Sequence, residues 1–183
     1  ASRFGRRFWR RWGQVAGCAL LVSAGSALMF PKSWISFGVL HGIAVMLLIV
    51  RLLAPHLSVW TLGGLAALCW GGHFAYQSLL HMGHSLPAAF DTPWLNWLGL
   101  VSHKPPTEDF VPLLPWLSAV LLGCALGLQL PRLAAQRNWR LAAPRSMAAL
   151  VWLGRHSLSF YLLHQPVFWG LLYAAAYLGW RPA

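Results

Sequence analysis

The segment from Gly154 to Leu178 reads GRHSLSFYLLHQPVFWGLLYAAAYL. From Ser157 onward it is mostly apolar for about 20 residues, the length that a helix needs to cross the hydrocarbon core of a bilayer. Arg155 and His156 stand just before it, and His164 lies within it. Polar and ionisable groups are costly in lipid, so they normally face a protein interior or a wet cavity and have a partner or a task there. This stretch predicts a membrane-spanning helix with a polar site.

The composition of the whole chain is typical of a membrane protein. Of its 183 residues, 58% are hydrophobic and 9% are charged, whereas about 25% are charged in an ordinary soluble domain. The net charge of +11 would favour nucleic acid as the partner of a soluble protein. Here most arginines lie at the ends of apolar segments, where they set topology and contact anionic lipid headgroups. We therefore expect the lipid bilayer as a partner, and no nucleic acid.

Five apolar windows are long enough to span a membrane. Prolines and a long polar connection separate them, as expected of residues that start or stop helices. Glycines four residues apart, such as Gly38 and Gly42, predict close approach of helix backbones in lipid. The expected fold is all-α, a polytopic membrane helix bundle in which residues 1–183 form a single transmembrane domain. The predicted spans cover residues 13–30, 34–53, 57–80, 112–130 and 157–178.

The distribution of positive charge predicts the orientation of these spans. Eleven of the 14 basic residues fall on the side that holds the N-terminus, and the other three are Lys32, Lys104 and Arg181. Because cytoplasmic loops carry an excess of Lys and Arg, we expect the N-terminus and residues 131–156 to be cytoplasmic. The connection 80–111 and the C-terminus then lie outside.

Three histidines lie inside the predicted spans, namely His41, His73 and His164. Each is roughly 10 Å into the apolar layer at 1.5 Å per residue. Taken alone, each is explained equally well by a hydrogen bond to a neighbouring helix or by a function. Three together favour a function. Pro166 follows His164 by two residues, and its ring removes one helical hydrogen bond, which predicts a kink beside the imidazole.

The mouth of the last span combines a cation, a titratable imidazole and a hydroxyl in Arg155, His156 and Ser157. With Ser157 as the N-cap, the free amides and the dipole of the helix end favour an anion. The alternative is an ordinary cap beside an arginine that extends toward the membrane surface.

The connection 80–111 contains all three acidic residues and three histidines. Connections of this length usually have a functional or binding role. We interpret the histidines individually as solvated, because the pair in His81-Met-Gly-His84 is a weak metal signal without further ligands. No metal is therefore expected. The acids are Asp91, Glu108 and Asp109, and the third histidine is His103.

Four short blocks occur in an order and spacing that are specific when taken together. On these blocks the sequence resembles the membrane acyltransferase family that includes heparan-alpha-glucosaminide N-acetyltransferase and its small bacterial relatives, over nearly the whole chain up to Pro166. The blocks are Trp34-Ile-Ser-Phe-Gly-Val-Leu-His41-Gly-Ile, Asp109-Phe-Val-Pro-Leu-Leu-Pro115-Trp116 with the following Gly123-x-x-x-Gly127, Trp152-Leu-Gly-Arg-His156-Ser157-Leu, and Tyr161-Leu-Leu-His164-Gln-Pro166.

The resemblance implies transfer of an acyl group, such as acetyl, from a coenzyme A thioester to a hydroxyl or amine of a sugar-like acceptor. Such chemistry needs a general base, a stabiliser for the oxyanion and cations for the donor phosphates. By resemblance, the catalytic residues are His164, Asp109 and His41. Acyl-CoA would be bound by Arg155, His156 and Ser157. The implied partners are a small-molecule or glycan acceptor and other chains in a homo-oligomer or larger membrane complex.

One departure from the family pattern concerns the N-terminal region. Family members begin with a helix that bears Asp-x-x-Arg-Gly, followed by a histidine that is thought to act in acyl transfer, and nothing in residues 1–30 matches this module. The chain is therefore expected to be the C-terminal part of a larger bundle, either because the sequence begins after this module or because the protein has lost it.

Two other functions are alternatives. One is a non-catalytic membrane subunit that packs into a larger complex through its glycine and tryptophan faces. The other is a haem protein with His41 and His73 as axial ligands, since both lie beside glycines that would admit a flat macrocycle.

Overall fold

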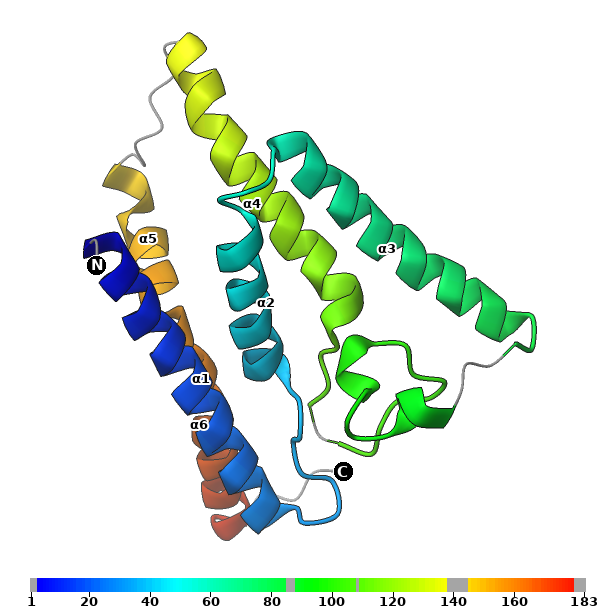
Figure 1. The fold of residues 1–183 in the computed structure, drawn as a ribbon. Coiled ribbons are helices and arrows are strands. Elements are labelled where there is room, and N and C mark those ends of the chain that lie inside the picture. The colour runs from blue at the N-terminus through cyan, green and yellow to red at the C-terminus, as the bar shows by residue number, and fades with distance from the viewer. Residues whose placement is uncertain (1–2, 85–87, 108, 138–144, 180–183) are drawn as a thin grey trace. The chain divides into compact units, whose positions relative to one another are not determined.

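A computed structural model describes residues 3–84, 88–107, 109–137 and 145–179. These residues form six α-helices and three short 3₁₀-helices, and none of them is in a β-strand (Figure 1). The all-α prediction is confirmed. The elements are α1 (Arg3–Met29), α2 (Val39–Leu53), α3 (Val59–His81), η1 (Ala88–Asp91), η2 (Asn96–Leu98), α4 (Leu113–Gln136), η3 (Arg145–Met147), α5 (Ala148–Arg155) and α6 (Ser157–Tyr177).

Each of the five apolar windows contains one long helix, but the boundaries of three helices differ from the prediction. Helix α1 begins at Arg3, before the predicted span that starts at residue 13. Helix α2 begins at Val39 rather than at Trp34. Helix α4 continues through Pro131 to Gln136, although we expected Pro131 to end it. The proline removes one backbone hydrogen bond, yet Ala134 beyond it is buried, so packing holds this last turn in helical form. Helix α5 was not predicted.

The chain forms two compact units, one from Ala1 to Trp139 and the other from Arg140 to Ala183. The first unit contains α1 to α4 with the connection between α3 and α4, and the second contains α5 and α6. Each unit is described by itself below.

The core of the first unit lies where α3 packs along α4, with α2 on the other side of α4 (Figure 1). Leu62 and Ala66 of α3 are completely buried. They are four residues apart and therefore lie on one face of their helix. On α4 the buried residues recur at the same spacing. The core residues are Met46, Leu62, Ala66, Leu113, Leu117, Leu121 and Ala125.

Helices α1 and α2 are joined by side-chain hydrogen bonds. The indole N–H of Trp12 donates to the carbonyl oxygen of Ala44 at 3.0 Å. At the other end of α1, the hydroxyl of Ser26 accepts a 3.0 Å bond from the backbone N–H of Ile35, in the link between the two helices. Because these bonds tie both ends of the pair, they set the position of the first residues of α2 against α1.

The connection before α4 folds back against the start of that helix. Gly99 ends η2 with a φ of +92°, a left-handed conformation that glycine adopts at little cost. A Cβ atom at this position would overlap the carbonyl oxygen of Leu114 and lie 2.9 Å from Cβ of Pro112. A glycine is therefore needed at this close approach, which brings residues 109–112 toward α2.

Two helices are long and apolar enough to cross a membrane, in the segments Gly5–Met29 and Leu113–Gln136, within the described residues. Only 11% and 28% of the residues in their apolar windows are buried, whereas a core helix of a soluble protein would be mostly buried. Helix α2 is apolar but shorter. Helix α3 is long, but polar residues such as His73 and Gln77 lower its mean hydropathy. The exposed apolar helices indicate a membrane protein, and the predicted number of about five spans is not established by them.

Candidate functional site

Two residues that are distant in sequence meet at the start of α2. Oδ2 of Asp109 accepts a 2.8 Å hydrogen bond from the backbone N–H of Val39. Val39 is the first residue of α2, where the N–H groups have no partner within the helix. The carboxylate therefore caps α2 from another part of the chain, and its negative charge complements the helix dipole.

Glycine at position 38 permits this contact. A Cβ atom there would overlap Oδ2 of Asp109 and lie 2.8 Å from Cγ2 of Ile35. One turn later, a Cβ atom at Gly42 would lie 3.1 Å from the carbonyl oxygen of Val111. The close approach predicted for Gly38 and Gly42 is therefore present, but the partner is the segment before α4 rather than another helix.

His41 has hydrogen-bond partners on both ring nitrogens. Nε2 lies 3.2 Å from the hydroxyl oxygen of Ser23, and that hydroxyl donates its only proton to the carbonyl of Ile35 at 2.6 Å. Ser23 can then only accept from the imidazole, which places the proton on Nε2. Nδ1 accepts from the backbone N–H of Gly38 at 3.4 Å. This pattern assigns the neutral Nε2–H tautomer.

An aromatic wall closes one side of this cluster. The ring of Phe37 lies 5.8 Å from that of His41 and 6.0 Å from that of Trp97, as measured between centroids. Trp97 belongs to η2, so the cluster collects residues from α1, α2 and the connection before α4. Asp109 also lies close enough to His41 for a direct electrostatic interaction.

An apolar pocket of about 480 Å³ begins beside this cluster and continues between α2 and α4. Its lining contains no ionisable side chain. Among the side chains that line it, only the indole of Trp116 carries a polar group, so the pocket fits mainly hydrocarbon. The lining residues are Val39, Ile43, Met46, Val111, Trp116, Ala119 and Val120.

In the second unit, His164 is held by its own helix. Its Nδ1 hydrogen-bonds to the carbonyl oxygen of Tyr161, and its ring stacks at 6.5 Å on that of Phe160. A carbonyl can only accept, so Nδ1 carries a proton. In the neutral ring Nε2 then has a lone pair, and no described residue donates to it.

The side chains of Gln165 and Pro166 lie outside the described part of the structure. The kink predicted at Pro166 therefore stays a prediction.

The cluster at the start of α6 differs from the prediction in one respect. Ser157 is the first residue of α6 and not its N-cap, a position that His156 occupies without a side-chain cap bond. Ser157 does not cap α6 because α5 continues into α6 with only His156 between them. His156 has φ −106° and ψ 12° instead of the extended backbone of a capping residue. Arg155 ends α5 and is exposed.

The imidazole of His156 packs on its own helix in the same way as His164. Its Nδ1 donates to the carbonyl of Trp152 at 2.9 Å, and the two rings lie 4.5 Å apart. As a result, its Nε2 is the nitrogen available to a ligand.

The structure brings Asp109 and His41 together, and Arg155, His156 and Ser157 are neighbours in the second unit. His73 of α3 is not part of either group. Its Nδ1 is buried and has no hydrogen-bond partner among the described residues. Since both nitrogens of His41 are occupied, no free nitrogen remains on that ring for a haem iron.

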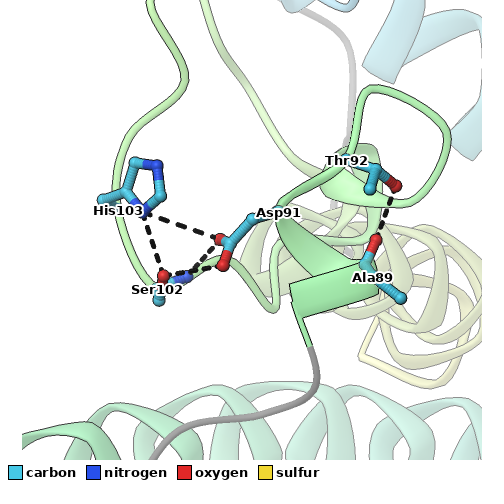
Figure 2. A network of polar contacts seen from close by, with 5 residues as sticks. All are labelled: Ala89, Asp91, Thr92, Ser102 and His103. Atoms are coloured by element: carbon cyan, nitrogen blue, oxygen red, sulfur yellow. Dashed lines mark hydrogen bonds and ion pairs between the residues drawn. The ribbon is translucent and has the colours of Figure 1, made fainter.

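The connection before α4 contains a separate polar network (Figure 2). Oδ1 of Asp91 accepts a 2.8 Å bond from the backbone N–H of Ser102, and Oδ2 accepts a 2.7 Å bond from its hydroxyl. These bonds from Ser102 are the main cause that lowers the pKa of Asp91 below its ordinary value. His103 lies 3.9 Å from the carboxylate. The serine proton goes to the carboxylate, so Ser102 is not activated by the imidazole.

Within the described residues, no group of three or more His, Cys, Asp or Glu side chains could hold a metal ion. Neither the pair His81 and His84 nor the network around Asp91 forms such a group.

Sequence reasoning missed Ser23, which completes the contacts of His41. A hydroxyl in the middle of an apolar window was a weak signal that could have been noticed. Ser102 was missed as well, and no local pattern pairs it with Asp91.

The comparison with protein families matches residues 1–166 to the model of heparan-alpha-glucosaminide N-acetyltransferase, catalytic. No curated protein and no solved structure matches the chain. The match includes Asp109, His41 and His164, the residues around which the two clusters are built. The chain belongs to the heparan-alpha-glucosaminide N-acetyltransferase-like family of acyltransferases.

Proposed function

We propose that this chain is an integral-membrane acyltransferase that moves an acyl group, such as acetyl, from coenzyme A to a hydroxyl or amine of a sugar-like acceptor. The family supports an acyltransferase type of function. The donor and the acceptor class belong to the proposal.

The observation that carries the proposal is the hydrogen bonding of His164. Its Nδ1 is fixed by the carbonyl of Tyr161, which orients the ring and leaves the lone pair of Nε2 for a proton. A neutral imidazole held in this way, with one ring nitrogen free, is suited to general-base catalysis. His41 has no nitrogen left for this role, so we assign it to positioning together with Asp109.

In the proposed reaction, Nε2 of His164 takes the proton of the acceptor hydroxyl or amine. The acceptor atom attacks the thioester carbonyl carbon, the carbon–sulfur bond breaks, and the thiolate leaves and takes up a proton to give coenzyme A. Arg155, His156 and Ser157 bind the donor, with Arg155 as the cation for its phosphates.

We further propose that residues 1–183 form one domain with five spans and a cytoplasmic N-terminus in a bacterial inner membrane. Each of the five apolar windows contains one long helix, and the asymmetry of positive charge supports the orientation. A cysteine accessibility scan would test it. Labelling of residue 103 from the cytoplasmic side would contradict the proposed path.

The function is tested by incubating membranes that contain the full-length protein with radiolabelled acetyl-CoA and glucosamine as acceptor. We expect transfer of the label, and a loss of about 10² to 10⁴-fold in His164→Ala. His56→Ala is the control, because His56 is exposed between α2 and α3 and should keep full activity. Unchanged transfer in His164→Ala would remove this residue from the mechanism.

A non-catalytic membrane subunit is the second candidate function. The large exposed apolar surface, which includes Trp60 and Trp116, favours it because such a surface can also contact other membrane proteins. Absence of acetyl transfer together with co-purification of a membrane partner would support this candidate. The haem function is disfavoured because both ring nitrogens of His41 are occupied. A Soret band in the spectrum of the purified protein would support haem binding after all.

A further inference from the structure

Four arginines lie on one face of the first turns of α1. Residues 6, 7, 10 and 11 fall within an arc of about 140° at 3.6 residues per turn, and all four side chains are exposed. Residues 3–12 form about 15 Å of helix before the apolar part of α1. This length exceeds one headgroup layer, which is about 5 to 8 Å thick. The arginines therefore lie where the helix passes through the membrane surface.

A fifth arginine, from another helix, lies at the same end of α1. The guanidinium of Arg51, in the last turn of α2, lies 5.6 Å from the ring centroid of Phe8, a cation–π distance. Trp12, one turn after Phe8, donates to Ala44 of α2, which holds the two helices together at this end. The placement of Arg51 is thus part of the packing of α1 on α2. We call the five residues Arg6, Arg7, Arg10, Arg11 and Arg51 the arginine patch.

No carboxylate neutralises the arginine patch within the described residues. The ion pair that the described residues form lies elsewhere, between His103 and Asp91 in the connection before α4. Asp109 caps the opposite end of α2 from Arg51. Five cations that have no counter-charge in the described part of the chain attract anions from outside it.

The shape of the surface distinguishes between sources of anions. Four of its arginines lie on an exposed face of α1, and Trp9 beside them is 55% exposed. A nucleotide-bearing donor is normally bound in a concave site, whereas the pocket found in this unit is apolar and lies at the other end of α2. A row of phosphates at a bilayer surface fits a convex basic face with exposed tryptophan.

We propose that the arginine patch binds the phosphate groups of anionic phospholipids, and that the protein prefers such lipids over zwitterionic ones. The proposal rests on the placement of α1 in a membrane and does not depend on acyl transfer. Each arginine near a charged membrane surface contributes about a fivefold gain in affinity.

The test uses the full-length protein in a neutral detergent and measures binding of short-chain phosphatidylglycerol and phosphatidylcholine by native mass spectrometry. We expect phosphatidylglycerol to bind more tightly, with an affinity that falls as salt rises. Arg10→Gln should lose about fivefold, and the variant with Gln at positions 6, 7, 10 and 11 more than roughly a hundredfold. Arg→Lys at the same four positions keeps the charge and should retain the preference.

Lys32→Gln is the matched control, because it removes one exposed cation at the opposite end of α1 and should change nothing. If the fourfold variant does not fold, the double variant Arg6→Gln with Arg10→Gln should lose about 25-fold. Equal binding of the two lipids, or an unchanged preference after the Gln substitutions, overturns the proposal.

A second arm distinguishes the lipid from the acyl donor. Coenzyme A is added to the same variants, and its affinity should not change in the fourfold Gln variant. Loss of coenzyme A binding there, with no preference for phosphatidylglycerol in the unaltered protein, would assign the patch to the donor instead. Acetyl transfer in detergent is measured separately, so failure of the proposed enzyme function does not affect this result.

Discussion

Asp109 Oδ2 accepts a 2.8 Å hydrogen bond from the backbone N–H of Val39, which precedes it by 70 residues. This bond caps α2 and joins the helix to the connection that enters α4. It also holds the carboxylate near His41. The geometry of the candidate site in the first unit thus depends on one contact between distant parts of the chain, and the first predictions address it.

Gly38→Ala should displace the carboxylate. Its Cβ atom would overlap Oδ2 of Asp109 and lie 2.8 Å from Ile35, so we expect a loss of about 1–3 kcal/mol in the free energy of unfolding. Thermal unfolding in detergent measures it. Gly13→Ala is the control, since a Cβ atom there meets nothing within 4 Å, and alanine should stabilise this helix by roughly 0.5–1 kcal/mol. Equal effects of the two substitutions would contradict the steric argument.

Asp109→Ala should uncap α2 without unfolding the chain. The loss of a cap costs about 0.5–2 kcal/mol, and the amide of Val39 should exchange its hydrogen faster. Asp109→Asn keeps an acceptor oxygen and should retain most of the protection. Hydrogen exchange measured by mass spectrometry on peptides that cover residues 36–46 provides the readout. Protection that is unchanged in Asp109→Ala would show that the bond does not hold the helix end.

Ser23→Ala should free Nε2 of His41. The hydroxyl is the acceptor that fixes the proton on this nitrogen, so the imidazole would lose its assigned tautomer. We expect a fall in acetyl transfer of roughly tenfold or less, smaller than that in His164→Ala, because Ser23 acts through the positioning residue. Ser23→Thr keeps the hydroxyl and should rescue the activity. A loss equal to that of His164→Ala would instead assign His41 a direct role.

The network around Asp91 predicts a dependence of loop stability on pH. Hydrogen bonds from Ser102 lower the pKa of Asp91 in the folded protein. The stabilisation is therefore fully present above the unfolded-state pKa of about 3.9 and is lost as the pH falls below it through the folded pKa. Hydrogen exchange of Ser102, corrected for intrinsic rates, measures this loss, and Asp91→Asn should abolish the dependence. The same pH profile in Asp91→Asn would refute the assignment.

The contact of α3 with α4 predicts different effects for two leucines on α4. Leu121 is 1% exposed and Leu126 is 58% exposed. Leu121→Ala leaves a cavity and should cost about 2–5 kcal/mol, whereas Leu126→Ala should cost well under 1 kcal/mol because its side chain contacts lipid or detergent. Unfolding in detergent compares them directly. Equal costs would place Leu126 in a further protein contact.

Much of the helix pattern could be predicted from the sequence, and the exceptions have physical reasons. The ends of α3 and α6 agree with the apolar windows because hydrophobicity alone marks them. Helix α2 begins late because a cap from Asp109 fixes its start, and hydropathy carries no information on a contact over 70 residues. Helix α4 passes Pro131 because buried Ala134 holds the turn beyond it. Local propensity could not show this packing.

The bonding of the candidate site could not be predicted from the sequence. By resemblance, His41 and Asp109 were expected in one site with His164, and the structure places the side chains of His41 and Asp109 close together. The bond from the N–H of Gly38 to Nδ1 of His41 is local to the start of α2. The sequence did not reveal that Ser23 occupies Nε2 of His41, since this bond depends on the packing of α1 on α2. In the same way, Ser157 was expected to cap α6, but α5 continues directly into that helix.

The bond between Asp109 and Val39 also has a consequence for the order in which the protein is made. A ribosome adds about 5–20 residues per second, so Val39 is synthesised about 4 to 14 s before its partner, which follows 70 residues later. For this interval the first turn of α2 exists without its cap. Helix α2 must therefore hold its place at first through α1, by way of Trp12 and Ser26, and its final start is set only when the fourth long helix begins to emerge.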